Sequence, residues 1–352
     1  MYNIKFDFTR QLVLLFLGIF LSLGVSAQES LFEYIGPPDA VNLPEHAVAG
    51  QKVRVNRRAL QSPRISIELF GETHQAVRKH IDRQKAGQTV WTGYLEGNPG
   101  NTVILTVRGN TVSGFIQNGL ETYRIGASSA ADNRLFMLDL RALPADDVGG
   151  VPMGDGDAQA APNAEPAADN TVQDLLVVYN QAACNSAGSC SQLQADIVTA
   201  VADINSAYSE SGVNITMNLV GTTFTNYSGT GASATLSALA GTNDGQMDEI
   251  HQVRDDLGAD IVAMVYDGQG CGIGYSPSSA SSAFSVTDET CLVGNRTMAH
   301  EIGHNQGALH DRKQHGGGTS GAYNYGYRRC SDGTDEDLGS PYFRTFMSYG
   351  CT

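Results

Sequence analysis

Residues 297–311 are TMAHEIGHNQGALHD, in which three histidines and two acids stand close to a pair of glycines. His300 and His304 are four positions apart, and a helix turns by about 400° over four residues, so both imidazoles project from one face. Glu301 lies about 100° around the helix from His300, within reach of a water beside a metal but poorly placed as a further ligand. The spacing predicts a helix that carries two metal ligands and a general base.

A turn after this helix supplies a third ligand. Gly307 has no Cβ atom and can adopt a left-handed conformation, so the chain can reverse there and bring His310 back to the metal. Three neutral imidazoles leave the fourth position of a tetrahedral zinc ion to water, which is typical of catalytic rather than structural zinc. The alternative is an exposed polar helix with incidental histidines, and the third histidine at this spacing disfavours it.

The motif resembles that of a known class of enzymes. HEIGHNQGALHD resembles the HExxHxxGxxHD signature of the metzincin zinc endopeptidases. TMAHEIGH, with Asp311 directly after the third histidine, is most similar to the adamalysin or reprolysin branch of that class. The resemblance covers about residues 171–352. It implies an α/β fold of the zincin type, in which a twisted, mostly parallel sheet packs against the active-site helix.

The resemblance also implies a role for each residue of the motif. Glu301 would act as general base and then as proton donor in the hydrolysis of a peptide bond by a zinc-activated water. Met347, in FRTFMSYG at 343–350, would form the methionine turn beneath the metal, and Asp311 would be a structural carboxylate. The implied cofactor is Zn²⁺, with three ligands: His300, His304 and His310.

Tyr349 departs from the adamalysin pattern. MSY at 347–349 matches the Met-x-Tyr of astacins and serralysins, in which the tyrosine contacts zinc or stabilises the oxyanion. Tyr349 is therefore a candidate catalytic residue that donates to the developing oxyanion, and a tyrosine that only packs near the sheet is the alternative. The resemblance further implies that an extended substrate adds as a strand along residues 272–275 and that residues 321–346 wall the specificity pocket.

The first residues indicate export. Lys5 and Arg10 precede an apolar run over residues 12–23, and VSA at 25–27 offers the small-x-small pattern of a signal peptidase site. This pattern predicts a cleaved signal peptide at residues 1–27. The apolar run is shorter than the ~20 residues that span a bilayer, so no membrane association is expected after cleavage. We therefore expect a secreted, extracellular product.

Cysteine usage agrees with export. All six cysteines lie after residue 183, and an even number suits disulfide bonds in an oxidising compartment. Six cysteines allow many pairings, and the order along the chain suggests one set of three. The suggested pairs are Cys184 with Cys190, Cys271 with Cys291, and Cys330 with Cys351. Because the first 183 residues contain no cysteine, latency through a cysteine switch is excluded.

Two regions with different patterns flank a polar segment. Residues 28–141 contain short alternating stretches between Asn-Gly and Gly-Asn turns, which predict an antiparallel β-rich pro-domain with a short helix at 74–84. Residues 142–170 are rich in Ala, Pro, Gly and Asp and predict a disordered linker. From residue 171 strands alternate with helices, which predicts an α/β catalytic domain over 171–352. Strands are expected at 65–70, 88–97, 101–109, 111–119, 171–180, 214–224 and 260–268, and longer helices at 192–210 and 244–258.

The charge and the motifs together indicate a function. A formal net charge of −15 makes nucleic acid a poor partner, and protein or peptide substrates are expected. We expect a secreted, monomeric zinc endopeptidase that is made as a zymogen. Its linker contains no Lys or Arg, so we expect the linker to be cut by autolysis or by a protease that tolerates small residues. The alternatives are a secreted binding or adhesion module and a narrow-target toxin on a metzincin scaffold. The intact Glu301 and the three histidines favour hydrolysis.

Overall fold

The computed structural model describes residues 29–36, 43–84, 87–129, 132–144, 170–276, 279, 281–312, 324–329 and 343–349. The expected signal peptide, nearly all of the expected linker and the suggested Cys330–Cys351 pair lie outside these described residues. Within them, no helix combines the length and the apolar character that a membrane crossing requires.

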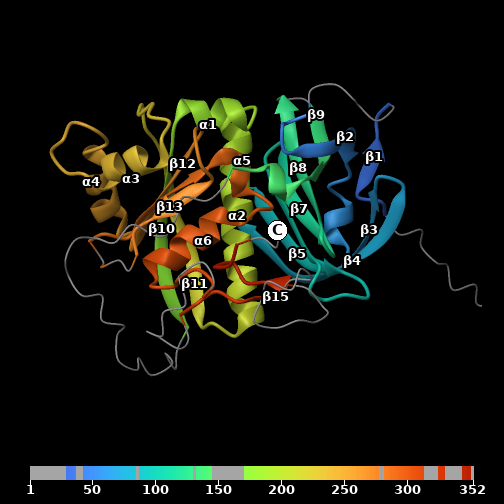
Figure 1. Ribbon diagram of the computed structural model, residues 1–352. Helices are drawn as coiled ribbons and strands as arrows, with labels where there is room; N and C mark the ends of the chain where they lie inside the picture. Colours follow the sequence, from blue (N-terminus) through green and yellow to red (C-terminus); the bar gives the residue numbers. More distant parts are fainter. Residues whose placement is uncertain are drawn as a thin grey trace, which may run out of the picture.

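The described N-terminal residues form one sheet of nine strands, drawn in blue to green in Figure 1. Its order is β1-β2-β9-β8-β7-β6-β5-β4-β3, and the pairs are antiparallel, as the sequence predicts. Gly109 and Gly119 take positive φ values of 58° and 61° in two of the hairpin turns, a conformation that glycine permits. The strands are β1 (Phe32–Tyr34), β2 (Ala47–Val55), β3 (Arg64–Leu69), β4 (Glu72–Gln84), β5 (Gln88–Leu95), β6 (Thr102–Arg108), β7 (Thr111–Asn118), β8 (Glu121–Ser129) and β9 (Asp132–Leu138).

The prediction of a short helix at 74–84 is wrong. These residues belong to β4, which pairs with β3 on one side and with β5 on the other. The strand begins after a turn at Phe70 and Gly71, whose φ values of 48° and 100° are those of a tight hairpin turn. The charged composition of this stretch is compatible with a helix. It forms a strand because pairing with a neighbour on each side satisfies its backbone hydrogen bonds, and this tertiary context outweighs the local propensity.

After residue 170 the described residues form a five-stranded sheet in the order β11-β10-β12-β14-β13. Strand β10 pairs parallel with β11 and β12, β12 pairs parallel with β14, and β13 runs antiparallel to β14 at the edge. The strands are β10 (Thr171–Tyr179), β11 (Ile215–Phe224), β12 (Ile261–Tyr266), β13 (Gly272–Gly274) and β14 (Phe284–Asp288). The strands expected at 171–180, 214–224 and 260–268 are therefore present.

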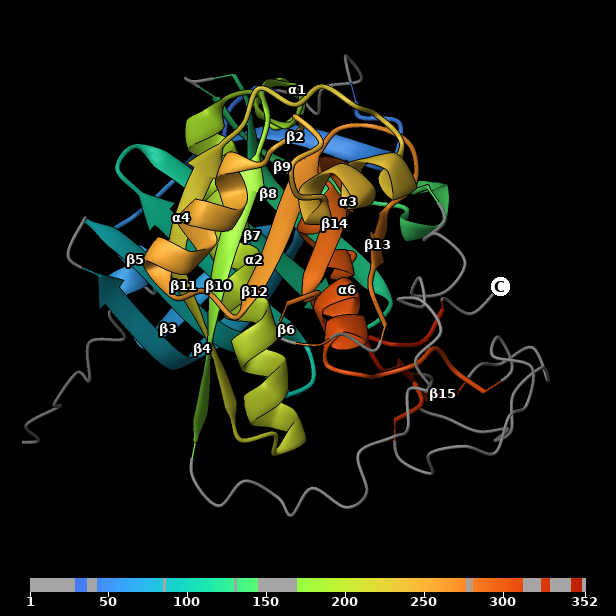
Figure 2. The ribbon, with the colours of Figure 1, turned by 90° about the vertical axis from the view of Figure 1, so that its left-hand side faces the viewer.

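Helices cover both faces of this sheet, with α3 and α4 on one side and α2 on the other (Figure 2). Side chains alternate along a strand, so Leu175 and Val177 of β10 lie in the core beneath α2 and α6, while Leu176 and Val178 lie in the core beneath α3 and α4. The expected helix at 244–258 begins only at Glu249. The helices are α1 (Gln181–Ser186), α2 (Cys190–Ser211), α3 (Ala232–Ala240), α4 (Glu249–Leu257), α5 (Glu289–Leu292) and α6 (Thr297–Asn305).

Helix α2, expected at 192–210, has a defined start and end. The side chain of Ser189 accepts a hydrogen bond from the N–H of Gln192 at 3.1 Å, which caps the first turn. Gly212 ends the helix with a left-handed φ of 68°. The disulfide between Cys184 and Cys190 joins α1 to the first residue of α2 and confirms the first suggested pair.

The same helix lies between the two sheets (Figure 1). Val90, Ile104 and Phe115 of the N-terminal sheet belong to one apolar core with Leu193 and Ile197 of α2. The N-terminal sheet and the α/β part therefore share buried surface instead of packing as independent bodies.

Arg124 carries a buried charge across this interface. From β8 it donates to Asp196 of α2 at 3.0 Å and to Glu289, the first residue of α5. The Arg124 side chain is 10% exposed, and those of Asp196 and Glu289 are 0% and 2% exposed. A buried charge without its partner costs several kcal/mol, so each part of the chain needs the charges of the other.

Candidate metal centre and active site

Helix α6 places two of the three predicted histidines on one face. Nε2 of His300 lies 2.9 Å from Nε2 of His310, and Nε2 of His304 lies 3.0 Å from the same atom. All three side chains are buried, and their ligand atoms lie within 4.8 Å of one another. This group could therefore hold a metal ion.

Backbone carbonyl groups fix the tautomers of two of the rings. Nδ1 of His300 lies 2.6 Å from the carbonyl oxygen of Phe346, and Nδ1 of His304 lies 2.9 Å from that of Ala308. A carbonyl only accepts, so each Nδ1 carries the proton and each Nε2 presents a lone pair. Burial is the main cause that lowers the pKa of His300 well below its usual value, which keeps the ring neutral.

The converging nitrogen atoms fit zinc. Nε2 of His310 lies within 3.0 Å of both other Nε2 atoms, and it can donate to one of them at most. The lone pairs of two buried ring nitrogens therefore converge on one atom of the third ring. A cation placed among the three nitrogens can accept all of their lone pairs, and neutral imidazole is a preferred ligand of Zn²⁺.

The chain reverses directly after α6 at Gly307. Its φ of 90° lies in the region that favours glycine, as the sequence predicts. The N–H of Ala308 donates to the carbonyl of Gly303 at 2.9 Å and closes the end of the helix. The N–H of Leu309 then donates to the carbonyl of Asn324 at 2.6 Å, so the segment with the third histidine is held against a neighbouring stretch of chain.

Glu301 is buried on the same helix, beside the edge strand β13. A Cβ atom at Gly272 would lie 2.9 Å from Cγ of Glu301, and one at Gly274 would lie 2.8 Å from its carbonyl oxygen. Glycine at both positions therefore lets the strand approach the helix this closely. The edge strand expected at this place is thus in contact with the candidate general base.

The predicted methionine turn lies against the same helix. A Cβ atom at Gly303 would clash with Sδ of Met347, so Gly303 makes room for the turn. The ring of Tyr349 stands 4.6 Å from the ring of His310, centroid to centroid. The N–H of Tyr349 donates to Asp311 at 3.3 Å, which ties the methionine turn to the segment of the third histidine.

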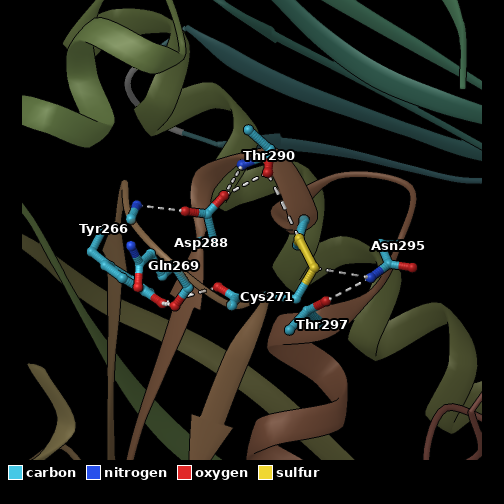
Figure 3. The surroundings of a disulfide bond; sticks show 10 residues. Tyr266, Gln269, Cys271, Asp288, Thr290, Asn295 and Thr297 are labelled. Carbon is cyan, nitrogen blue, oxygen red and sulfur yellow. Dashed lines mark hydrogen bonds between the residues drawn. A yellow bond between two sulfur atoms is a disulfide. The ribbon is translucent and has the colours of Figure 1, made fainter. Parts of the chain in front are cut away.

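A disulfide braces the loop that leads into α6 (Figure 3). Cys271, just before β13, is bonded to Cys291 of α5, which confirms the second suggested pair. Nδ2 of Asn295 donates to Oγ1 of Thr297 at 2.9 Å and lies 3.7 Å from Sγ of Cys271. The start of α6 is therefore held in place relative to the edge strand.

Comparison with known proteins gives consistent matches. A family model of reprolysin-like metallopeptidases, family M12B, matches residues 194–311. A peptidyl-Asp metalloendopeptidase of Stenotrophomonas maltophilia (strain K279a) is 33% identical over 331 residues, which cover 86% of this chain and 76% of that protein. A protein of the same name from Xanthomonas campestris pv. campestris is 29% identical, with 93% and 79% covered. Among solved structures, metalloproteinase-II from Bacteroides fragilis matches 71% of this chain and 81% of its own chain at 13% identity. Its TM-score of 0.39 is too low to support a conclusion about the fold.

The buried histidine cluster and these matches define a metzincin-like zinc metalloprotease. Its cofactor is Zn²⁺, and its substrates are proteins or peptides. More particularly, the chain belongs to the reprolysin-like metalloendopeptidases of family M12B.

The structure brings the three predicted histidines and the ring of Tyr349 together. Glu301 lies on α6, the helix that also carries His300 and His304. Sequence reasoning missed the carbonyl groups of Phe346 and Ala308 that orient two histidines, because every residue has such a group and no side chain marks it. It also missed the reason for the two glycines of β13. The G-x-G of CGIGYSP is the signal from which that close approach could have been inferred.

Proposed function

We propose that this chain is a secreted zinc endopeptidase that cleaves peptide bonds at aspartate residues. The observation that carries the hydrolytic function is the convergence of three imidazole nitrogens, two of them from a helix that also bears a buried glutamate. The aspartate preference is supported by relatives that are named peptidyl-Asp metalloendopeptidases and by two arginines near the histidine segment, Arg344 and Arg328. The parallel strands behind α6 support assignment to the zincin fold.

Each site residue has a proposed role. Bound zinc supplies a Lewis acid that polarises the scissile carbonyl and lowers the pKa of water. Glu301 accepts the proton of the attacking water and then delivers it to the leaving amine. It follows His300 directly, about 100° around the helix, and it is not one of the three converging ligand residues. The proposed ligands are His300, His304 and His310.

The edge strand β13 is the proposed binding place for the substrate backbone. One side of it pairs with β14, and in the described part of the chain no strand pairs with its other side. An extended peptide can therefore add to this edge through main-chain hydrogen bonds. Because Gly272 and Gly274 contact Glu301, a peptide bound there runs past the general base.

Most of the basic residues after position 170 follow the third histidine in the sequence. Five of the seven Lys and Arg residues after position 170 lie between residues 312 and 344. Arg344, in β16 (Phe343–Arg344), pairs with Arg328, in β15 (Arg328–Arg329), and its Nη1 donates to the carbonyl of Ser348 at 2.8 Å. Burial is the largest cause of the lowered pKa of His300, and the positive charge of Arg344 is one of the smaller causes. The charge of Arg344 therefore acts on the histidine cluster.

Arg344 is the proposed partner of the substrate aspartate. A guanidinium group binds a carboxylate through charge-assisted hydrogen bonds. Arg328 is a weaker candidate, because its Nε lies 3.6 Å from Asp311 and both side chains are buried. That pair balances its charge within the protein.

Replacing Arg344 by glutamine tests the substrate preference. Loss of a hydrogen bond to a charged group, worth ~1.5–3 kcal/mol, should lower kcat/KM for an aspartate-containing peptide by about 10- to 150-fold. The matched peptide with asparagine should be a poor substrate of the unaltered chain and should be little affected by the substitution. Arg344→Lys, which keeps the positive charge at this position, is the comparison variant and should lose less. An unchanged ratio between the two peptides would remove Arg344 from recognition, and equal cleavage of both by the unaltered chain would remove the aspartate preference.

Replacing Tyr349 by phenylalanine separates its two possible roles. If the hydroxyl donates to the oxyanion, kcat should fall by about 10²- to 10³-fold while zinc content stays the same. If the ring only packs beside His310, kcat should stay close to that of the unaltered chain. Measuring kcat and bound zinc on the same preparation decides between them.

Secretion and synthesis as a zymogen complete the proposal. We infer that residues 1–27 are a signal peptide, that residues 28–141 form a pro-domain, and that 142–170 link it to the catalytic domain at 171–352. Because the linker has no Lys or Arg, we expect cleavage there by autolysis or by a protease that accepts small residues. N-terminal sequencing of the secreted form should give a start between residues 142 and 175. A start far outside this range would refute the expected processing.

A further inference from the structure

Arg296 occupies an unusual position at the start of α6. It is the N-cap residue and has a φ of 69°, in a region that non-glycine residues seldom adopt. Its carbonyl accepts a hydrogen bond from the N–H of His300 at 3.1 Å. Such a conformation persists where the surroundings hold it, and it often occurs at functional sites.

The side chain of Arg296 connects three parts of the molecule. Its guanidinium carbon lies 5.5 Å from the ring centroid of Phe115 and 4.9 Å from that of Phe346. Its Nε donates to Asp203 of α2 at 3.0 Å. Both ring distances are within the range of cation–π attraction. The guanidinium thus lies in contact with the N-terminal sheet, with α2 and with the methionine turn.

One end of this chain of contacts is the metal centre. Phe346 contacts Arg296 through its ring and accepts from Nδ1 of His300 through its carbonyl at 2.6 Å. The partner of Nδ1 sets the tautomer and the orientation of a ligating imidazole. A shift of Phe346 would therefore turn the ring of His300.

The other end is the N-terminal sheet. Phe115 is 1% exposed, and it extends from β7 into the core shared with α2. The loop before α6 also touches this sheet, because a Cβ atom at Gly294 would lie 3.0 Å from Thr122 and 3.3 Å from Leu138. The sheet thus supports both the loop and the guanidinium.

We propose that Phe115 of the N-terminal sheet is a positioning residue for the zinc site, acting through Arg296 and Phe346 on His300. In the full chain, the N-terminal sheet is then part of what orders the metal centre. The inference rests on the proposed role of His300 as a zinc ligand.

Zinc affinity of the full chain, measured by competition with a chromogenic chelator, tests this role independently of catalysis. Phe115→Leu should lower the affinity about tenfold, since partners of a ligating histidine typically contribute 10- to 100-fold. Ile116→Val is the matched control, because Ile116 is the next residue of the same strand and lies in the core on the other face of the sheet. It should leave the affinity unchanged. Equal affinities of Phe115→Leu and Ile116→Val would overturn the proposal.

Two further variants keep the test decisive. The double variant Phe115→Leu/Phe346→Leu should lose less zinc affinity than the sum of the losses in the two single variants, because both side chains act through one guanidinium. Full additivity would contradict the relay. If Phe115→Leu does not fold, Arg296→Lys replaces it, since lysine keeps a charge for Asp203 but stacks poorly between two rings. It should weaken zinc binding, and unchanged binding would overturn the proposal. Absence of zinc binding by the unaltered chain would instead refute the proposed function.

Discussion

Replacing Glu301 by glutamine should lower kcat on a peptide substrate by about 10²- to 10⁴-fold, the usual contribution of a general acid–base group. Glutamine has nearly the same size but can neither take a proton from water nor deliver one to the leaving amine. Glu301 is buried on α6 and contacts the edge strand, so the substitution keeps the packing of both elements. The loss should therefore be in kcat, with zinc content unchanged.

Steady-state kinetics and metal analysis on one preparation check this result. Glu249→Gln is the control, since Glu249 opens α4 on the far face of the sheet and should leave kcat unchanged. If the Glu301 variant keeps zinc and turns over at the rate of the unaltered chain, another group must move the proton. If it loses zinc, its fall in activity says nothing about proton transfer, and His310→Ala provides the zinc-free reference.

Replacing Arg124 by methionine should cost about 3–5 kcal/mol of the free energy of unfolding, the usual result of breaking a buried ion pair from one side. Arg124 is the cation between Asp196 and Glu289, which lie at 0% and 2% exposure. Methionine fills a similar volume but leaves both carboxylates buried without that cation. Denaturant unfolding of the full chain measures the effect.

Arg54→Met is the matched control for this prediction. Arg54 pairs with Glu33 in the same sheet, but both side chains are 66% exposed, and exposed pairs contribute about 0–1 kcal/mol. Combining Arg124→Met with Asp196→Asn and Glu289→Gln should recover part of the lost stability, because neutral side chains need no cation. A loss as small for Arg124 as for Arg54 would show that the ion pairs do not hold the two parts together.

The features that the sequence predicts well are those with local causes. The positions of His300, His304 and Glu301 follow from helix geometry, and the reversal at Gly307 follows from a residue without Cβ. The strand at 171–180 was predictable because a run of apolar residues is typical of a strand buried on both faces. In each case the signal lies within about ten residues.

The features that the sequence did not predict have causes far away in the chain. Residues 74–84 form a strand because two neighbouring strands pair with them, although their own composition suits a helix. The contacts of Arg124 with α2 and of Arg296 with Phe115 join residues that are 72 to 181 positions apart in the chain. Nothing near either arginine marks its partners, so only the fold reveals that the N-terminal sheet packs against the α/β part.

The zinc content of the purified, correctly oxidised chain tests the central claim most directly. Equilibrium dialysis followed by metal analysis should find one zinc ion per chain, removable by a chelator together with peptidase activity and restored by added zinc. His310→Ala should retain little zinc, because it removes the nitrogen that lies within 3.0 Å of both other ligands. A chain that holds no stoichiometric zinc after such loading, or one in which His310→Ala binds it as tightly, would contradict the account.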